Sequence, residues 1–214
     1  MSLVLPLFPL SGVVLLPGTL LPLYIFEPRY RALVADALAG SRTIGIAMLK
    51  RGWEEQGSNP PIHAVGGGGE IVESEKLDDG RYNILLVGRF RYRVLGEEPA
   101  AAPYRIARVE EVASLPFFDV SEEERACRAA TRLFDRIREP LELPPVPRER
   151  LSSERLASEI ALRLRYAPEE LQALLETDSV SARFGTLMGR MREWRRRMEF
   201  LAPFRPAQLD VRRN

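Results

Sequence analysis

LVLPLFPLSGVVLLPGTLLPLYIFEPRYR, residues 3–31, is the stretch that decides the fold. It is apolar enough to cross a membrane, yet six residues before Pro28 break helices: Pro6, Pro9, Gly12, Pro17, Gly18 and Pro22. An interior proline removes a helix hydrogen bond and clashes with the preceding turn, so one spanning helix is excluded. No basic segment precedes the stretch and no small-residue cleavage site ends it, which argues against a signal peptide. The pattern predicts short buried strands joined by turns, followed by a helix starting near Pro28.

Composition indicates an ordinary globular protein without a strong electrostatic preference. The 214 residues carry 31 basic and 30 acidic side chains, so the net charge is +1. Such a balance gives no overall basic field that would favour nucleic acid. Cys127 is the only cysteine, which excludes an internal disulfide framework and is typical of a reducing compartment. The sequence shows no transmembrane or targeting segment, and we expect a bacterial-type cytoplasmic protein.

The first half of the chain has the features of a β-rich domain. Strands are predicted over four segments: Thr43–Lys50, Glu70–Leu77, Arg81–Leu95 and Tyr104–Ala113. The dipeptide Asp79-Gly80 lies between two of them and signals a hairpin. The spacing of apolar residues between Pro28 and Gly40 is helical, with proline at the start and glycine at the end. The glycine run Gly66–Gly69 is expected to be a bulge or a tight bend between strands.

The second half changes to helical periodicity. Ser121 and Glu124 form a predicted capping box before one apolar stripe. Ser152 or Ser153 is expected to cap a second helix, and Pro168 to start a third. These patterns predict a β-rich domain over residues 1–118, a helical domain over 119–203 and a C-terminal tail over 204–214.

The last predicted helix carries the clearest apolar stripe of the chain. Its members include Phe184, Leu187, Met191 and Trp194. Their spacing places them on one helix face, too large to be left in contact with water. We expect this stripe to hold the helical half against the β-rich half.

Several motifs, in the same order, resemble the N-terminal domain of Lon proteases. They are the P-L-F-P, P-G and I-F-E-P-R-Y elements of residues 3–31, the segment Gly80–Leu86 that leads into Arg89–Arg91, and Leu171–Asp178 before the last helix. The resemblance covers residues 3–200. It implies an α+β fold, in which a PUA-like β pseudo-barrel with one or two short helices precedes a C-terminal α-helical bundle.

The sequence lacks the motifs of the enzymatic modules that follow this domain in Lon proteases. No G-x-x-x-x-G-K-[ST] motif is present, and Gly66–Gly69 lacks the lysine and hydroxyl residue of a phosphate-binding loop. His63, the only histidine, has no nucleophile near it in the sequence, and Cys127 has the spacing of a helix core residue. We therefore expect a stand-alone, non-enzymatic protein with no catalytic residue, no metal site and no cofactor.

Three arginines alternate along one predicted strand. Arg89, Arg91 and Arg93 share a face because strand side chains have a period of two. One interpretation is a ladder that contacts phosphates, since PUA-like barrels include RNA binders. The other is a solvated face neutralised by acidic residues of neighbouring strands, such as Glu110. No aromatic residue shares this face to stack a base, which favours the solvated face and leaves RNA binding as the alternative function.

The resemblance and the missing catalytic motifs favour recognition of polypeptide. We expect unfolded or apolar polypeptide as ligand and a Lon-type protease as a candidate partner, as for an adaptor or chaperone-like factor in protein quality control. The apolar residues before the first helix exceed what a small barrel readily buries, so the binding surface is expected around Tyr24, Phe26, Arg29 and Tyr30, or else between the two halves of the chain. Alternatively, Phe26 and Tyr30 pack the first helix onto the barrel. The sequence specifies neither the client nor the oligomeric state.

Overall fold

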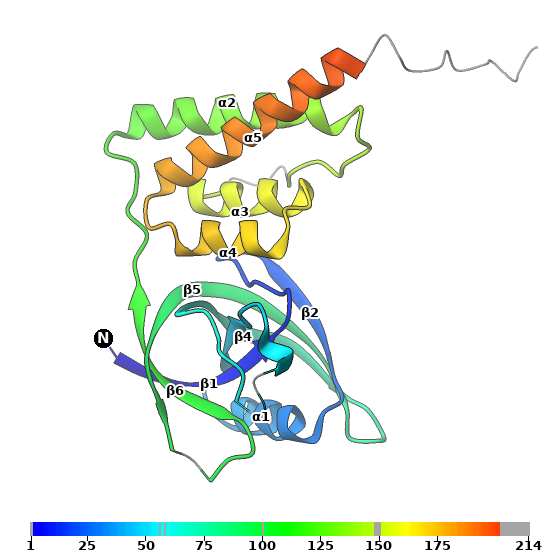
Figure 1. The fold of residues 1–214 in the computed structure, drawn as a ribbon, viewed down its shortest axis with the longest axis vertical. Coiled ribbons are helices and arrows are strands. Elements are labelled where there is room, and N and C mark those ends of the chain that lie inside the picture. The colour runs from blue at the N-terminus through cyan, green and yellow to red at the C-terminus, as the bar shows by residue number, and fades with distance from the viewer. Residues whose placement is uncertain (1, 56, 58, 100, 148–150, 202–214) are drawn as a thin grey trace, which may run out of the picture.

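The fold is that of a computed structural model describing residues 2–55, 57, 59–99, 101–147 and 151–201. Six strands lie in the described part of the first half: β1 (Ser2–Leu10), β2 (Leu20–Ile25), β3 (Thr43–Met48), β4 (Val65–Lys76), β5 (Tyr82–Glu98) and β6 (Arg105–Val112). The helices are α1 (Pro28–Ala39), the short 3-10 helix η1 (Trp53–Glu55), α2 (Val120–Arg138), α3 (Ser153–Arg163), α4 (Pro168–Glu176) and α5 (Val180–Leu201). The predicted α+β class, with strands before a helical half, is confirmed (Figure 1).

The strands form a barrel that β5 closes. Their order is β2-β5-β4-β3-β1-β6, and β6 pairs again with β5. Only the β1–β3 pair is parallel among the described strands. The first half of β5 pairs with β2, and residues Arg91–Glu98 pair with β6, with a register shift between Val94 and Gly96. Bulges bend a strand and increase its twist, which lets one long strand complete the barrel.

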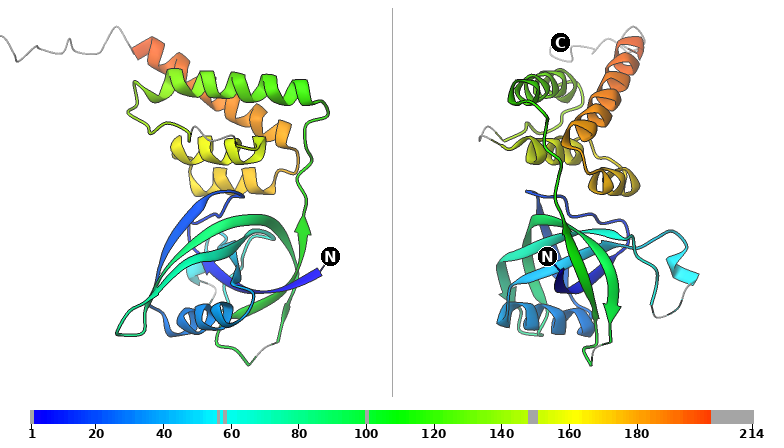
Figure 2. Two further views of the ribbon diagram at one scale, coloured as in Figure 1. Left: turned by 180° about the vertical axis from the view of Figure 1, so that it is seen from behind. Right: turned by 90° about the vertical axis from the view of Figure 1, so that its left-hand side faces the viewer.

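Helix α1 covers the end of the barrel that lies farthest from the helical half (Figures 1 and 2). It begins at Pro28, as predicted, and its buried residues Tyr30, Leu33, Val34 and Ala37 belong to the main barrel core. A proline is well placed there because the first helical N–H groups have no partner within the helix.

The glycine run lies inside β4 and admits a crossing segment. Strand β4 begins at Val65, earlier than predicted, and the expected bulge falls between Gly68 and Gly69. A Cβ atom on Gly67 would collide with the carbonyl oxygen of Leu15. The connection between β1 and β2 therefore passes directly over the sheet, where only glycine leaves enough space.

The helical half has its own apolar core, and two of its predicted helix starts are confirmed. Ser152 caps α3, its hydroxyl accepting a hydrogen bond from the Arg155 N–H at 3.2 Å, and α4 starts at Pro168. The predicted capping box at Ser121 is wrong. Asp119 caps α2 instead, because its carboxylate already accepts the hydrogen bond of the Ser121 N–H at 2.9 Å.

The apolar stripe of α5 does not reach the barrel. Phe184, Leu187 and Met191 are buried against α2 and α3, and Trp194 packs half-buried on the same core. The expectation that this stripe joins the two halves is therefore wrong, because α4 lies between α5 and the barrel (Figures 1 and 2). The predicted domain boundary at residue 118 lies between β6 and α2, and the predicted tail, 204–214, lies outside the described residues.

Candidate functional site

Strand β2 has an unpaired edge and an exposed apolar side. Among the described strands it pairs with β5 alone. Leu21, Leu23 and Ile25 point towards the barrel core, whereas Leu20 and Tyr24 are 60% and 47% exposed. Alternation along a strand places such residues on opposite faces. A strand with this pattern presents both free backbone groups and apolar side chains to a partner.

The apolar side of β2 continues onto its neighbour. Pro22 lies opposite Leu85 and Leu20 lies opposite Val87, so these side chains share one face of the sheet. Just past the strand, Phe26 is 59% exposed, and its ring centroid lies 6.2 Å from that of Tyr24. We call this surface the β2 face, and it consists of Leu20, Pro22, Tyr24, Phe26, Leu85 and Val87. Contiguous exposed apolar surface of this kind is typical of an interaction site.

An arginine from the β4–β5 hairpin lies against the β2 face. The Arg81 guanidinium carbon is 5.2 Å from the Tyr24 ring centroid, within the range of a cation–π contact. Arg81 is also paired with Asp79, whose pKa its side-chain and backbone hydrogen bonds hold below the usual range. The hairpin predicted at Asp79-Gly80 is confirmed, with Gly80 at a φ of 79°. It therefore supports one end of the β2 face.

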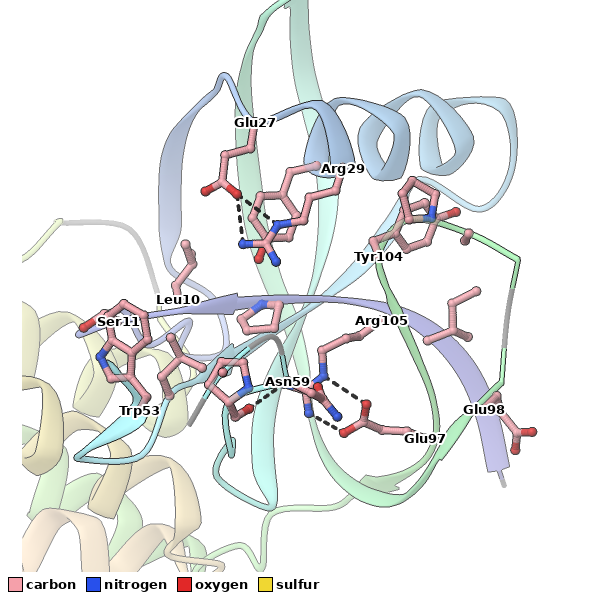
Figure 3. A pocket seen from close by; sticks show the side chains of 18 residues that line it. Leu10, Ser11, Glu27, Arg29, Trp53, Asn59, Glu97, Glu98, Tyr104 and Arg105 are labelled. Atoms are coloured by element: carbon pink, nitrogen blue, oxygen red, sulfur yellow. Dashed lines mark hydrogen bonds and ion pairs between the residues drawn. The ribbon is translucent and has the colours of Figure 1, made fainter. Parts of the chain in front are cut away.

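A cleft of about 570 Å³ opens beside the start of α1 (Figure 3). Its walls come from the turn after β1, the loop that contains η1, and the β5–β6 hairpin. Three aromatic side chains line it together with aliphatic residues and prolines: Tyr30, Trp53 and Tyr104. This volume, with a lining that mixes apolar and charged side chains, is typical of ligand pockets.

The charged groups in the cleft are mostly paired with each other. Arg105 donates to Glu97 through Nε at 3.0 Å and to the Pro60 carbonyl oxygen at 2.8 Å. Arg29 donates to Glu27 at 2.9 Å (Figure 3). Because the positive charges of Arg105 and Arg29 already have acidic partners, the cleft suits an uncharged ligand segment better than a phosphate.

The four predicted surface residues lie in two places. Tyr24 and Phe26 are exposed on the β2 face, whereas Arg29 and Tyr30 line the cleft. Tyr30 is only 7% exposed, and its ring stacks on Phe8 with centroids 4.1 Å apart. The alternative that a predicted residue packs α1 onto the barrel thus describes Tyr30 and not Phe26.

Sequence reasoning missed part of both surfaces. The alternation of Leu20, Pro22 and Tyr24, with a proline that suits an edge strand, could have indicated the β2 face. No local pattern could have placed Trp53 and Tyr104 in one cleft, because they come from separate loops.

The expected arginine face is wrong at Arg91. Its side chain is 1% exposed and contacts the end of α4, because that helix covers the outer face of β5 at this point. Arg89 is exposed and pairs with Glu70 at 2.8 Å, and Arg93 is exposed opposite Glu110. The three arginines therefore do not form one solvated ladder, and this arrangement gives no support to RNA binding.

The described residues offer little material for metal or thiol chemistry. No group of three or more potential metal ligands occurs within the described ranges. His63 pairs with Glu176, and burial raises the pKa of the Cys127 thiol, with Glu123 adding to the effect. A raised thiol pKa reduces the reactive thiolate form. No helix in the described part of the chain has the length and apolar character needed to span a membrane.

The sequence matches one family along nearly its whole described length. The family model of the ATP-dependent protease La (LON) substrate-binding domain matches residues 4–193. The chain belongs to this family. The resemblance to the Lon N-terminal domain inferred from the sequence motifs is thereby confirmed.

Curated relatives of this LON substrate-binding domain are Lon proteases. That of Anaeromyxobacter dehalogenans is 31% identical over 198 residues, which cover 89% of this chain and 23% of the relative. Lon protease 2 of Myxococcus xanthus is 32% identical over 198 residues, which cover 89% of this chain and 24% of the relative. The chain thus spans about a quarter of the length of these relatives.

Solved structures share the fold of this LON substrate-binding domain. The Lon N-terminal domain protein of Xanthomonas campestris matches with a TM-score of 0.64 at 23% identity, over 87% of this chain and 98% of that one. The N-terminal domain of a Mycobacterium avium complex Lon protease matches with a TM-score of 0.69 at 19% identity, over 88% of this chain and 98% of that one. These matches extend over both the barrel and the helical half.

Proposed function

We propose that this LON substrate-binding domain recognises unfolded or apolar polypeptide without chemistry of its own. The observation that carries the proposal is the β2 face, an exposed apolar surface on a strand with an unpaired edge. The family, named for substrate binding, supports the same role. An unfolded chain exposes the apolar side chains and backbone groups that such a surface can satisfy, whereas a folded protein hides them.

The binding mode that suits this surface is an extended segment lying along β2. Leu20 and Tyr24 offer apolar contact on one face, and the free edge offers backbone hydrogen bonds. Pro22 lacks an N–H group and interrupts the donors of that edge. Side-chain contacts therefore contribute more than the backbone ladder, which favours a tolerant, apolar specificity over a fixed sequence.

The cleft extends the same surface around the start of α1. Phe26 belongs to the β2 face, and Glu27, the next residue, lines the cleft beside Arg29. The Arg29 guanidinium lies over the Tyr30 ring, with its carbon 4.5 Å from the ring centroid. We propose that an apolar side chain of the bound segment enters this cleft, while Tyr30 serves as core.

Titration with a reduced, unfolded protein tests the proposal directly. We expect binding in the micromolar range, about −8 kcal/mol, from a few aromatic anchors. Phe26→Ser and Tyr24→Ser should each weaken binding at least tenfold without loss of the folded state, because both side chains are exposed. Leu95→Ser is the matched control, since Leu95 is 51% exposed on β5 but lies at the end that pairs with β6.

Three outcomes would contradict this assignment. One is the absence of binding up to about 1 mM, near −4 kcal/mol. The other is equal weakening by Leu95→Ser and Phe26→Ser, which would indicate a nonspecific apolar effect. A retained affinity in both β2-face variants would move the site elsewhere on the molecule.

We also propose that the protein acts beside a Lon-type protease, as an adaptor that presents bound polypeptide. The support is that its curated relatives carry this domain within Lon proteases. Degradation of an unfolded substrate by the host's Lon-type protease should change when the chain is added, and Phe26→Ser should abolish the change. An identical rate with and without the chain would refute the adaptor role while leaving polypeptide binding intact.

A further inference from the structure

The barrel and the helical half have separate cores and share a small apolar contact. The helical core is formed by α2–α5 with their connections, and the main barrel core by strands and α1. The cluster that spans the boundary has five buried members: Val14, Leu16, Met48, Val65 and Leu175. The backbone passes between the halves once, in the linker between β6 and α2. Bodies joined in this way reorient readily unless a specific contact fixes them.

One buried arginine crosses this boundary, and a second meets the linker from the helical side. Arg91 of β5 donates to the carbonyl oxygens of Leu175 and Ala113, each at 2.9 Å, and to the Asp178 carboxylate at 3.1 Å. It thus joins the barrel to the end of α4 and to the linker. Burial lowers the pKa of Arg91, and the charge of Arg183 lowers it further, so the nearby Asp178 carboxylate is needed as a counter-charge.

Arg183 of α5 completes the arrangement from the helical side. It is 4% exposed and donates to Glu154 of α3 at 2.6 Å and to the Ser114 hydroxyl at 3.0 Å. The Ser114 hydroxyl donates in turn to Glu154. The two arginines thereby donate hydrogen bonds to consecutive linker residues, Ala113 and Ser114, at the point where the chain leaves the barrel.

The two guanidinium groups share one acceptor. The Thr177 carbonyl oxygen accepts from Arg91 Nη1 at 3.3 Å and from Arg183 Nε at 2.8 Å. Each group also has its own carboxylate, so two positive and two negative charges meet where five segments of the chain converge. The two arginines are buried and the two carboxylates are partly exposed, so removing a carboxylate leaves a buried positive charge without its partner.

We propose that Arg91 and Arg183, with Glu154, Asp178 and Ser114, form a single latch that fixes the orientation of the helical half on the barrel. Opening the latch leaves the small apolar cluster, the Gln172–Val65 hydrogen bond and the exposed His63–Glu176 pair between the halves. We expect these to be too weak to fix the orientation, so that the helical half swings about residues 113–114 while both cores stay folded. The linker beyond that point moves with the helices, because Leu115 exchanges backbone hydrogen bonds with Asp178 and Val180, each at 2.9 Å.

Pulsed electron–electron double resonance, which measures the distance distribution between two spin labels, tests the latch in the full chain. We would place labels at Ser74→Cys on β4 and Arg132→Cys on α2, both exposed, in a Cys127→Ala background. The parent should give one narrow distance distribution. Arg91→Met and Arg183→Met should each broaden it at least twofold while circular dichroism retains the helical signal. Arg89→Met is the control, because Arg89 lies on the same strand but is exposed, and its distance distribution should remain narrow.

The double variant Arg91→Met/Arg183→Met distinguishes one latch from two independent contacts. We expect it to broaden the distribution no more than either single variant, because the groups share Thr177 and adjacent linker residues. Broadening that equals the sum of the two single effects would overturn the single latch. Narrow distributions in both folded arginine variants would overturn the latch altogether.

Milder variants keep the test decisive if the arginine variants fail to fold. Asp178→Asn removes the counter-charge of Arg91, and Ser114→Ala removes the hydroxyl between Arg183 and Glu154. Combined, they should broaden the distribution in a folded protein. A narrow distribution in this combined variant would contradict the proposal.

Discussion

The imidazole Nδ1 of His63 lies 3.0 Å from Glu176 Oε1, at the boundary between the barrel and the end of α4. The same carboxylate oxygen accepts from Gln172 Nε2 at 2.8 Å, and that amide also donates to the Val65 carbonyl oxygen at 2.8 Å. Gln172 is 2% exposed, whereas the side chains of His63 and Glu176 are 29% and 42% exposed. The boundary therefore combines a buried neutral hydrogen bond with a solvated pair.

Gln172→Ala should cost more stability than His63→Ala. Loss of the buried amide leaves the Val65 carbonyl oxygen without its partner, which costs about 1–3 kcal/mol. The solvated His63–Glu176 pair contributes at most about 1 kcal/mol. Urea unfolding of both variants at neutral pH measures the difference. Equal losses of stability in the two variants would show that the buried Gln172 amide does not stabilise the boundary between the barrel and α4.

Phe184→Ala should lower the free energy of unfolding by about 3–5 kcal/mol, the usual penalty for emptying a packed aromatic site. Phe184 is 3% exposed and packs edge-to-face on Phe117, with centroids 5.5 Å apart. Trp194→Ala should cost clearly less, because its ring lies half-buried at the margin of the same core. Thermal and chemical denaturation provide the comparison, and a larger loss for Trp194→Ala would contradict this packing.

Gly88→Ala should destabilise the barrel, whereas Gly96→Ala on the same strand should be tolerated. A Cβ on Gly88 collides with the Leu16 carbonyl oxygen, but a Cβ on Gly96 meets nothing within 4 Å. Overpacking of this kind costs about 1–3 kcal/mol. The two melting temperatures measure the contrast, and a neutral Gly88→Ala would mean that the crossing segment moves aside without cost.

Glu154 should contribute to loss of stability in acid. Burial raises its pKa, but hydrogen bonds from Ser114 and Arg183 and the positive charges of Arg183 and Arg91 outweigh that effect and lower it below the usual 4.5. The unfolded chain therefore binds this proton at higher pH than the folded one. Stability from Glu154 is present above pH 4.5 and is lost as the pH falls through the folded-state pKa.

Urea unfolding between pH 3 and 6 tests this assignment with Glu154→Gln. The variant should be less stable than the parent at neutral pH and should lose stability less steeply below about pH 4.5. Parallel pH curves for the two proteins would show that Glu154 does not titrate differently in the folded state.

Local sequence patterns predicted the helices, strands and turns better than the way these pack on one another. Proline and glycine positions fixed the start of α1 at Pro28 and the hairpin at Gly80, because backbone geometry there depends on the residues themselves. The period of β5 placed Arg91 on the outer face of the sheet. It could not indicate that α4, some eighty residues later, covers that face, because long-range packing leaves no local signal.

The candidate site was predictable to the same degree. Tyr24 and Phe26 were identified as surface residues from an excess of apolar side chains, and both are exposed. Tyr30 has a similar local context but lies on the inner face of α1, against Phe8. Which aromatic residue is buried depends on how the helix rotates onto the barrel, and that rotation follows from the whole core.

The pairing of β1 with β6 has a consequence for synthesis on the ribosome. Ser2 lies opposite Glu110, so the first strand lacks one of its two neighbours until more than a hundred further residues have emerged. At typical elongation rates this delay is on the order of 5–20 s. During that time Leu5 and Leu7, which end up buried, have no barrel to enter. A nascent chain of this protein therefore exposes apolar side chains of its first strand until the last strand of the barrel has been synthesised.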